Sequence, residues 1–330
     1  MNILIITPAP PGSRAGNRAT AERWAVLLER AGYQVSVETA FAGQACDLVL
    51  ALHAWRSHGD ILKIRHLFPD MPLVVALTGT DIYDHQHRYP DATLGSMALA
   101  DSLIGLHRLA GQAIPEPFRD KLVTVLQSAP HPAASCMNTT CGADREEPFL
   151  VSVIGHLRDE KDSLRAALAA RKLPPESRIR VVAAGRAHNQ QWAALAQQEE
   201  ADNERFQWVG ELDRQATMNL LLDSRLMVIS SVMEGGANVV SEACRAGIPV
   251  IASEIPGNIG LLGTAYPGYF PVRDEQALAD LLLRAEWEPE FLASLQARVA
   301  ALAASFTPER EQASLLRAID LALERATLSG

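Results

Sequence analysis

The sequence predicts an α/β protein of two consecutive Rossmann-like domains, each a parallel sheet covered by helices on both faces. Short, continuous apolar runs alternate with amphipathic stretches along the chain, which is the pattern of strands buried in a parallel sheet. The alternation is interrupted once, from Ala129 to Pro148, where proline, serine, threonine and small residues follow no period. We therefore place the domains at residues 1–135 and 149–330, with a linker at 136–148.

The composition suits two folded domains and narrows the class of protein. The chain has 330 residues, 48% of them hydrophobic and 21% charged, so it can bury a sizeable core. Its formal net charge of -9 disfavours a general binder of nucleic acid or of anionic membranes. No apolar run approaches the roughly 18 residues of a membrane span, and the first residues lack the basic start of a signal peptide. The four cysteines are scattered and are typical of reduced thiols, so we expect a cytoplasmic protein.

The first half contains six predicted strands. The first, Asn2–Thr7, leads through a glycine-containing loop into a helix from Thr20 to Arg30, and Gly32 ends that helix. The later strands of this half have the sequences QVSVET, DLVLAL, PLVVALTG, SLIGL and LVTVLQ.

The second half repeats the pattern and closes with a helix. Its predicted strands have the sequences FLVSVIG, RIRVVAAG, RFQWVG, RLMVISS, IPVIAS and GYFPV. The segment from Pro308 to Thr327 is strongly amphipathic, and we expect about 308–330 to cross back onto the first domain. Ligands of open α/β sheets bind beyond the carboxyl ends of the strands, so we expect the two domains to face a cleft that holds the site.

A candidate anion site follows the strand RLMVISS. The next residues, VMEGGAN, form the loop at the carboxyl end of the strand, and a helix begins near Ala237 or Asn238. Gly235 and Gly236 let backbone N–H groups approach a ligand closely. Because a helix N-terminus carries unpaired N–H groups and a positive dipole end, this segment predicts a diphosphate site.

Two glutamates flank this segment. Glu242 lies about one turn inside the helix, on the face of Asn238, where a carboxylate would accept the hydroxyls of a ribose. Glu234 precedes the helix and would accept hydroxyls of a group beyond the phosphates. The order hydroxyl, phosphate and ribose predicts an extended nucleotide sugar. The alternative is an acid at a helix N-terminus and an ordinary surface glutamate.

A second loop supplies positive charge. The strand FLVSVIG ends at Gly155, and a polar loop with Arg158 and Lys161 precedes the next helix. A diphosphate leaving group needs cations that stabilise the charge developing on it, and Arg and Lys provide them. Two solvated surface cations are the alternative interpretation.

These motifs together resemble the GT-B glycosyltransferases of the family 4-like group. The matching features are a glycine loop from Gly155 to Lys161, glutamates separated by seven residues at Glu234 and Glu242, and the strand GIPVIAS. The resemblance implies that the basic residues and the helix N-terminus bind the donor diphosphate, that Glu234 meets the donor sugar and that Glu242 binds the ribose. One position departs from the family: His156 stands where an arginine is usual, and we expect Arg158 to substitute for it.

A narrower resemblance covers nearly the whole chain. The stretches VSVIGHLRDEKD, VMEGGANVVSEA, SEIPGNIGLLGTAYPGYFPV and ALTGTDIY are similar to the selenosugar synthases of selenoneine biosynthesis. That family joins selenophosphate to a UDP-sugar, UDP-N-acetylglucosamine in the type reaction, and forms a carbon–selenium bond. The resemblance therefore implies a UDP-sugar donor, a selenophosphate acceptor and no further cofactor.

Three loops of the first half are candidates for the acceptor. The loop after the first strand carries Arg14 and Arg18 for an anion, and Gly16 gives it backbone freedom toward the acceptor or the donor phosphates. His53 follows the strand DLVLAL in a stretch rich in His and Arg. The alternatives are solvated arginines in an ordinary turn and a histidine that caps or fills the core.

The third candidate loop follows PLVVAL. Thr78, Thr80 and Asp81 offer hydroxyls and a carboxylate to a ligand, unless Asp81 only caps a helix. In the second half, Asn258 follows the strand IPVIAS and is a candidate contact for the donor sugar or base.

Transfer from a UDP-sugar needs no metal here, because protein cations and a helix terminus can hold the diphosphate. The sequence also has no Asp-x-Asp pair that could hold one. Selenophosphate carries an anionic selenium and would not need the general base that an alcohol acceptor often requires. The alternatives are a glycosyltransferase with another acceptor, a non-catalytic nucleotide-sugar sensor and a sugar-nucleotide epimerase.

Overall fold

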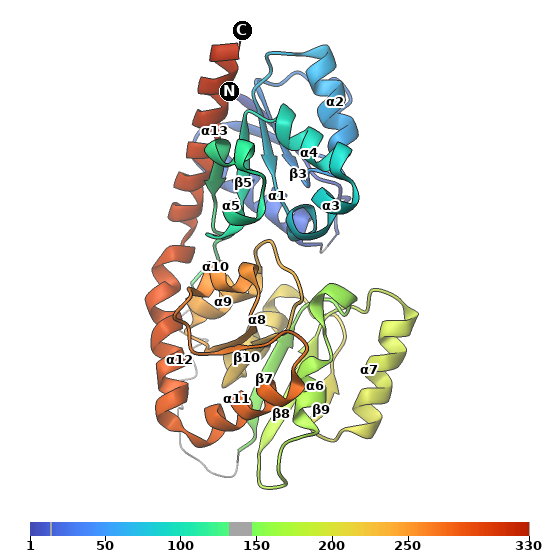
Figure 1. The fold of residues 1–330 in the computed structure, drawn as a ribbon, viewed down its shortest axis with the longest axis vertical. Coiled ribbons are helices and arrows are strands. Elements are labelled where there is room, and N and C mark those ends of the chain that lie inside the picture. The colour runs from blue at the N-terminus through green and yellow to red at the C-terminus, as the bar shows by residue number, and fades with distance from the viewer. Residues whose placement is uncertain (14, 132–146, 330) are drawn as a thin grey trace. The chain divides into compact units, whose positions relative to one another are not determined.

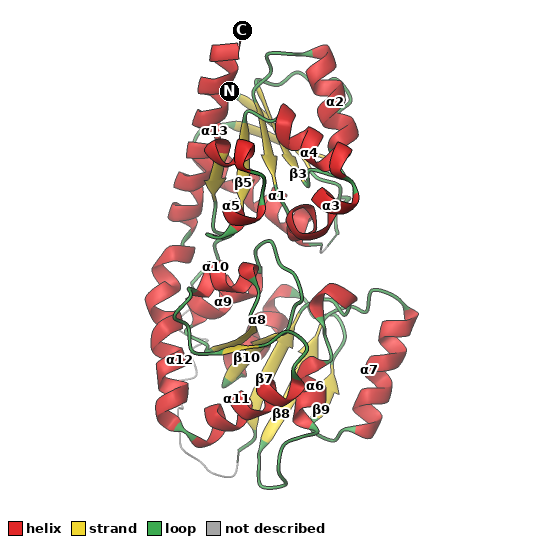
Figure 2. Cartoon of the chain, viewed as in Figure 1, coloured by secondary structure: helices red, strands yellow, loops and turns green. Residues whose placement is uncertain are grey.

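The protein is described by a computed structural model that covers residues 1–13, 15–131 and 147–329 (Figure 1). The chain divides into two compact units, one of Met1–Ser128 with Thr307–Gly330 and the other of Ala129–Phe306. Each unit contains one six-stranded sheet with helices around it (Figure 2), and this confirms the predicted fold class. The predicted linker, 136–148, lies largely outside the described residues.

The sheet of the first unit has the strand order β2-β1-β3-β4-β5-β6, with every pair parallel. Its strands are β1 (Asn2–Ile6), β2 (Gln34–Glu38), β3 (Leu48–Leu52), β4 (Leu73–Ala76), β5 (Ser102–Gly105) and β6 (Leu122–Thr124). Its helices are α1 (Gly16–Arg30), α2 (His58–Leu67), the π-helix η1 (Asp81–His85), α3 (Gln86–Arg88), α4 (Pro90–Leu99), α5 (Ala110–Ala113), the 3-10 helix η2 (Glu116–Lys121) and α13 (Pro308–Ser329).

Both faces of the central strands are buried, which explains why β3 and β4 are continuous apolar runs, whereas the edge strand β2 alternates between apolar and polar residues. On β1, Ile3 and Ile5 belong to the cluster that α1 and α13 cover. The residues between and after them, Leu4 and Ile6, belong to the cluster on the opposite face, with α2 and α4. Successive side chains of a strand point to opposite faces, so a strand between two helical layers has no position for a polar residue.

Helix α13 is part of the first unit, although it is the last element of the chain. Leu315, Ala318, Ile319 and Ala322 lie in the same buried cluster as Trp24 of α1. Glu311 of α13 is 1% exposed and accepts hydrogen bonds from the side chains of Arg23 and Trp24 and from the backbone and side chain of Ser128. A buried carboxylate held by this many donors fixes where the helix docks.

The sheet of the second unit has the order β12-β11-β10-β7-β8-β9, also parallel throughout. Its strands are β7 (Phe149–Ile154), β8 (Ile179–Ala184), β9 (Phe206–Trp208), β10 (Leu226–Ile229), β11 (Val250–Ser253) and β12 (Tyr269–Phe270). Its helices are η4 (Asp159–Lys161), α6 (Arg165–Ala170), α7 (Gln190–Asp202), α8 (Arg214–Asp223), α9 (Asn238–Ala246), α10 (Pro256–Leu262), α11 (Glu275–Trp287), α12 (Pro289–Leu302) and η5 (Ala303–Phe306).

All the predicted strands are present where the apolar runs placed them. The helix of the candidate anion site begins at Asn238, as predicted, and Gly247 ends it in a left-handed conformation with a φ of 71°. None of the described helices has both the length and the apolar composition that crossing a membrane requires.

The first helix is longer than predicted. It begins at Gly16 and not at Thr20, so Arg18 lies inside the helix and not in the loop before it. An ion pair between Arg18 and Glu22, four residues apart, stabilises this added turn.

Candidate functional site

In the second unit, the structure brings Lys161 and Glu234 together from two different loops. Lys161 ends η4, shortly after β7, and Glu234 follows β10, which is the neighbour of β7 in the sheet. The ammonium group of Lys161 donates to Oε1 of Glu234, and the hydroxyl of Ser231 donates to the same oxygen at 2.7 Å. Residues 73 positions apart in sequence thus form one charged pair at the carboxyl ends of adjacent strands.

A small pocket adjoins this pair and is partly open to solvent. Its wall includes Gly155, Lys161, Ser163, Ser230 and Ser231. The side chain of Lys161 is 22% exposed and that of Glu234 is 9% exposed, so both charges are only partly shielded from water. A ligand entering here would meet a cation, a carboxylate and several hydroxyls.

Glycines let the backbone close tightly around Glu234 and the glycine loop. A Cβ at Gly257 would lie 2.4 Å from the backbone oxygen of Glu234, and one at Gly185 would lie 1.9 Å from the backbone oxygen of Gly155. Gly185 also has a φ of 155°. Larger residues at either position would push apart the loops that hold the charged pair.

The predicted anion site occupies the start of α9. Ala237 is the N-cap, and no side chain caps the helix there. Gly236 and Asn238 are partly exposed, whereas Gly235 is buried beside Glu234. Glu242 lies on the second turn of α9 and is half-buried. The unpaired N–H groups thus lie at the start of a regular helix, and the carboxylate of Glu242 lies one turn further along it. The positive end of the helix dipole is at the loop.

The basic residues of the glycine loop differ in their surroundings. His156 accepts a hydrogen bond at its Nδ1 from the backbone N–H of Arg186 at 3.2 Å. Arg158 is largely exposed, with its side chain 46% accessible, and its Nε lies 3.8 Å from a carboxylate oxygen of Glu160. Arg158 therefore remains a candidate for contact with a ligand, while His156 contacts the neighbouring β8 loop.

Asn258 has a packing role that the sequence did not predict. Its side chain is completely buried, and its amide nitrogen donates to the backbone and side-chain oxygens of Ser253 at 2.9 and 3.1 Å. The amide nitrogen is thus engaged within the loop that it stabilises, and the contact of Asn258 with the donor stays a prediction.

In the first unit, Asp81 is the centre of a buried polar cluster at the ends of β3 and β4. Its Oδ1 accepts from the backbone N–H of Trp55 at 3.0 Å and lies 2.7 Å from Nδ1 of His53. Its Oδ2 accepts from the backbone N–H of Ala54 and from the N–H and hydroxyl of Thr78, at 2.9 to 3.0 Å. The carboxylate is fully buried, and its two oxygens are occupied by five donors.

These donors keep Asp81 ionised. Burial by itself raises the pKa of the carboxyl group, but the hydrogen bond and positive charge of His53, the proximity of His85 and the N–H of Thr78 together hold the pKa well below its usual range. We expected Asp81 to contact a ligand or cap a helix. The structure instead uses its carboxylate to hold two loops together, because both of its oxygens are already saturated.

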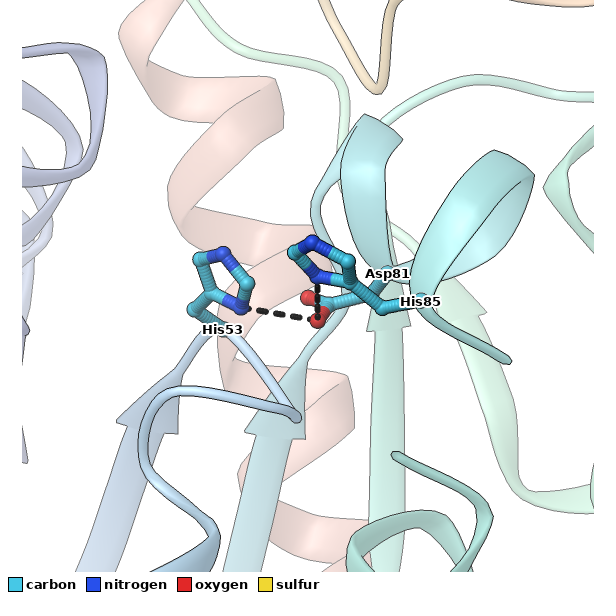
Figure 3. A group of neighbouring side chains, drawn as sticks. All are labelled: His53, Asp81 and His85. Atoms are coloured by element: carbon cyan, nitrogen blue, oxygen red, sulfur yellow. Dashed lines mark ion pairs between the residues drawn. The ribbon is translucent and has the colours of Figure 1, made fainter. Parts of the chain in front are cut away.

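Two histidines lie against Asp81 (Figure 3). His53 is 3% exposed and has a φ of 75°, a conformation that costs a non-glycine residue about 1–3 kcal/mol. His85 lies four residues after Asp81 on η1, with its Nδ1 3.9 Å from Oδ1, too far for a hydrogen bond. The two imidazoles stack with ring centres 5.4 Å apart.

An aromatic group that the sequence did not single out surrounds these histidines. Trp55 contacts the ring of His85 at 4.4 Å between centres and stacks on Tyr89 at 4.8 Å. The proximity of His85 to Asp81 could have been predicted from the sequence, since residues four positions apart share a helical face.

His53, Asp81 and His85 also offer three potential metal ligands within 4.8 Å of one another. The occupied carboxylate argues against that function, since an ion would have to displace the proton between His53 and Asp81. We therefore assign no metal to the cluster.

The remaining first-unit candidates lie near the start of α1. Gly16 is the first residue of this helix, and Arg14 lies outside the described residues. Arg18 is 8% exposed and pairs with Glu22 through Nε at 2.6 Å, while its NH1 is buried without a hydrogen-bond partner among the described residues. The NH1 nitrogen is thus a buried donor at the carboxyl end of β1, the neighbour of β3.

Comparison with known proteins agrees with this arrangement. Residues 142–301, which include the Lys161–Glu234 pair and α9, match the family Glycosyl transferases group 1. No curated protein matches the chain in sequence.

Solved structures of similar fold cover almost the whole chain. HepE from Anabaena, in complex with UDP and glucose, has a TM-score of 0.75 at 16% identity and covers 97% of this chain and 99% of its own. Sucrose-phosphate synthase from Thermosynechococcus elongatus has a TM-score of 0.74 at 16% identity, with 96% and 97% covered. The α,α-trehalose 6-phosphate synthase from Burkholderia multivorans has a TM-score of 0.71 at 15% identity, with 96% and 78% covered. The chain therefore has the GT-B fold of these structures, and the match to the group 1 glycosyl transferase family lies within its second unit.

Proposed function

We propose that the protein transfers a sugar from a UDP-sugar, UDP-N-acetylglucosamine in the first instance, to selenophosphate, giving a selenosugar and UDP. The observation that carries the glycosyltransferase part is the Lys161–Glu234 pair beside the start of α9. The choice of selenophosphate rests on the resemblance of four sequence stretches to the selenosugar synthases.

On the donor side, each group binds one part of the UDP-sugar. Lys161 and the N–H groups at the start of α9 bind the diphosphate, with Arg158 as an additional cation. Glu242 accepts the ribose hydroxyls. Glu234 accepts hydroxyls of the sugar, and its present partner, Lys161, turns to the phosphate when the donor binds. The solved structures of HepE with UDP and with UDP-glucose support a UDP-sugar as donor for this fold.

The reaction itself makes one bond and breaks one. A lone pair of the anionic selenium forms the bond to the anomeric carbon, and the bond from that carbon to the β-phosphate oxygen breaks, with its electron pair leaving on UDP. The selenosugar formed in this step keeps the phosphoryl group on its selenium. Because negative charge grows on the leaving diphosphate, Lys161 and the helix terminus stabilise the transition state more than the ground state. Selenium needs no proton removed, so the step requires no general base.

The first unit is the proposed acceptor side. Arg18 keeps one buried guanidinium nitrogen without a partner among the described residues, which supports a function in binding an anion. His53, Thr78 and Thr80 occupy the carboxyl ends of β3 and β4, the edge of an open sheet at which ligands bind.

One assay tests this function. The purified protein is incubated anaerobically with UDP-N-acetylglucosamine and fresh selenophosphate, and the products are identified by mass spectrometry. We expect a selenium-containing sugar and stoichiometric UDP, neither of which forms when donor or acceptor is omitted. Thiophosphate in place of selenophosphate tests the demand for selenium.

The other outcomes separate the alternatives. Release of UDP without a selenium-containing sugar would reject selenophosphate and leave a glycosyltransferase with another acceptor. Conversion of the donor alone to a different sugar nucleotide would indicate an epimerase. Binding of UDP-N-acetylglucosamine without any turnover would favour a sensor of nucleotide sugars.

A further inference from the structure

The cluster around Asp81 contains a closed ring of hydrogen-bonding contacts. Oδ1 of Asp81 lies 2.7 Å from Nδ1 of His53. Nε2 of the same imidazole lies 3.4 Å from the hydroxyl of Thr80. The hydroxyl of Thr80 lies 3.1 Å from that of Thr78, which donates to Oδ2 of Asp81 at 2.9 Å. The ring thus begins and ends on one carboxylate.

The ionised carboxylate sets the direction of every hydrogen bond in this ring. Asp81 can only accept, so His53 donates from Nδ1 and Thr78 donates its single hydroxyl proton. The contact between the two threonines must then use the proton of Thr80. The contact between Thr80 and His53 is left to a proton on Nε2.

The weakest contact of the ring involves one of its partly exposed residues. The 3.4 Å between Nε2 of His53 and Thr80 is long for a hydrogen bond, whereas the other three contacts are 3.1 Å or shorter. Thr80 is partly exposed, while Asp81 is fully buried. A ligand oxygen can therefore replace Thr80 as the partner of Nε2 without disturbing the contact between His53 and Asp81.

We propose that Nε2 of His53 and the hydroxyl of Thr80 form a subsite for a phosphate-type oxyanion, with Asp81 as the positioning residue that holds the imidazole. The inference rests on the proposed function, because it makes this subsite the one that holds the phosphoryl oxygens of the acceptor. It changes the expected task of Asp81: a carboxylate saturated by five donors orients the histidine and does not touch the acceptor.

His85 has a supporting position in this arrangement. Its ring stacks on that of His53 with an angle of 22° between the planes, and Trp55 packs against the ring of His85 at 4.4 Å between centres. Its Nδ1 is buried without a hydrogen-bond partner among the described residues. A phenylalanine at this position keeps a flat ring beside His53 and removes the only atom with which His85 could ligate an ion at the cluster.

Binding of a simple anion tests the subsite directly. The full-length protein, labelled with ¹⁵N at its 9 histidines, is titrated with inorganic phosphate and with thiophosphate, and with acetate at equal ionic strength as the control. We expect the Nε2 signal of His53 to shift with phosphate and thiophosphate and to stay in place with acetate. The signal is assigned by its absence in His53→Asn.

One substitution, with a matched control, tests the contact through Nε2. In His53→Asn, the amide nitrogen replaces Nδ1 against Asp81, but nothing replaces Nε2. We expect the acceptor KM to rise on the order of tenfold or more while the donor KM is unchanged, as for the loss of one charge-assisted hydrogen bond. His66→Gln, an exposed histidine of α2, is the matched control and should behave as the wild type.

The opposite results overturn the inference. Phosphate binding and an acceptor KM that survive His53→Asn would show that Nε2 is not a ligand contact. Stoichiometric zinc or another divalent metal in the purified protein, lost in His85→Phe, would show a metal site in place of an oxyanion subsite. Phosphate binding through His53 in a protein that forms no selenosugar would instead reject the proposed function and keep the subsite.

Discussion

The two units place a buried carboxylate at the same point of the same topology and use it differently. Asp81 follows β4, next to β3, and Glu234 follows β10, next to β7. Each is paired with a basic residue from the loop of the neighbouring strand, His53 in one unit and Lys161 in the other. Asp81 also accepts four further hydrogen bonds from the surrounding loops, whereas Glu234 shares its Oε1 between Lys161 and Ser231 at the wall of a pocket.

The difference shows how surroundings decide what a charged pair does. A carboxylate saturated with donors loses those contacts if it turns to a ligand, so it orients its partner. A carboxylate beside a solvent-open pocket can exchange partners when a ligand arrives, so both of its charges are available for binding and catalysis. Substitutions at the two positions should therefore affect different properties.

The largest effect is expected at Lys161. In Lys161→Ala, removal of a preorganised cation from the leaving diphosphate should lower kcat about 10²–10³-fold with little change in the unfolding free energy. Lys172→Ala, whose ammonium lies 3.9 Å from Glu275 on the same unit, is the matched control. Near-normal single-turnover rates in Lys161→Ala would remove Lys161 from the chemistry.

Asp81→Asn should act on stability first. The amide cannot accept from all five donors, so the unfolding free energy should fall by about 3 kcal/mol, the usual cost of breaking a buried charged pair. Urea titrations of this variant and of Asp84→Asn, which changes a more exposed carboxylate on the same π-helix, measure the difference. Glu234→Gln should show the reverse, with lost turnover and a smaller loss of stability than Asp81→Asn, because fewer donors hold Glu234. Equal destabilisation by Asp81→Asn and Glu234→Gln would contradict the contrast between the two carboxylates.

A smaller effect is expected from Glu242→Ala. Loss of a carboxylate that accepts ribose hydroxyls should weaken UDP binding by about 1.5–2 kcal/mol, or roughly 10- to 30-fold, and should mainly raise the donor KM. Calorimetry with UDP measures this change against Glu290→Ala, an exposed glutamate of α12. Unchanged affinity for UDP would show that the ribose lies elsewhere.

The smallest expected effect is on the pH dependence of the stability of the first unit. Burial lowers the pKa of His107 to about 4, and its ring nitrogens contact Tyr83 and the N–H of Leu109. Between that value and the ordinary value of 6.5 the unfolded chain binds the additional proton, so stability falls as the pH falls through this window.

Lowering the pH from 7 to 5.5 should therefore cost the wild type about 1 kcal/mol at His107. His107→Gln should lose that part of the pH dependence, measured as the slope of the unfolding free energy against pH. An identical slope in both proteins would contradict a neutral, buried His107.

The sequence predicts the strands and the donor-side helix well, because a strand buried on two faces must be a continuous apolar run, and because Gly235, Gly236 and Gly247 bound α9. It also predicts that Lys161 and Glu234 share a loop cluster, since both follow strands of one sheet. It could not predict that Asp81 is saturated, because three of its donors are backbone N–H groups whose positions depend on the tertiary fold. Arg18 was misplaced for a local reason: the helix starts one turn earlier than its apolar period indicates.

The position of α13 in the first unit has a consequence for how the protein is made. The buried cluster over one face of the first sheet includes Leu315 and Ile319, and Glu311 connects to Trp24 and Ser128. A ribosome delivers the six strands of that sheet long before it delivers this helix. The part of this face that α13 covers, along β4, β5 and β6, therefore stays apolar and exposed while the whole second unit is synthesised. Folding of the first unit is thus completed last, and the interval before α13 emerges is the time at which the nascent chain most needs a chaperone.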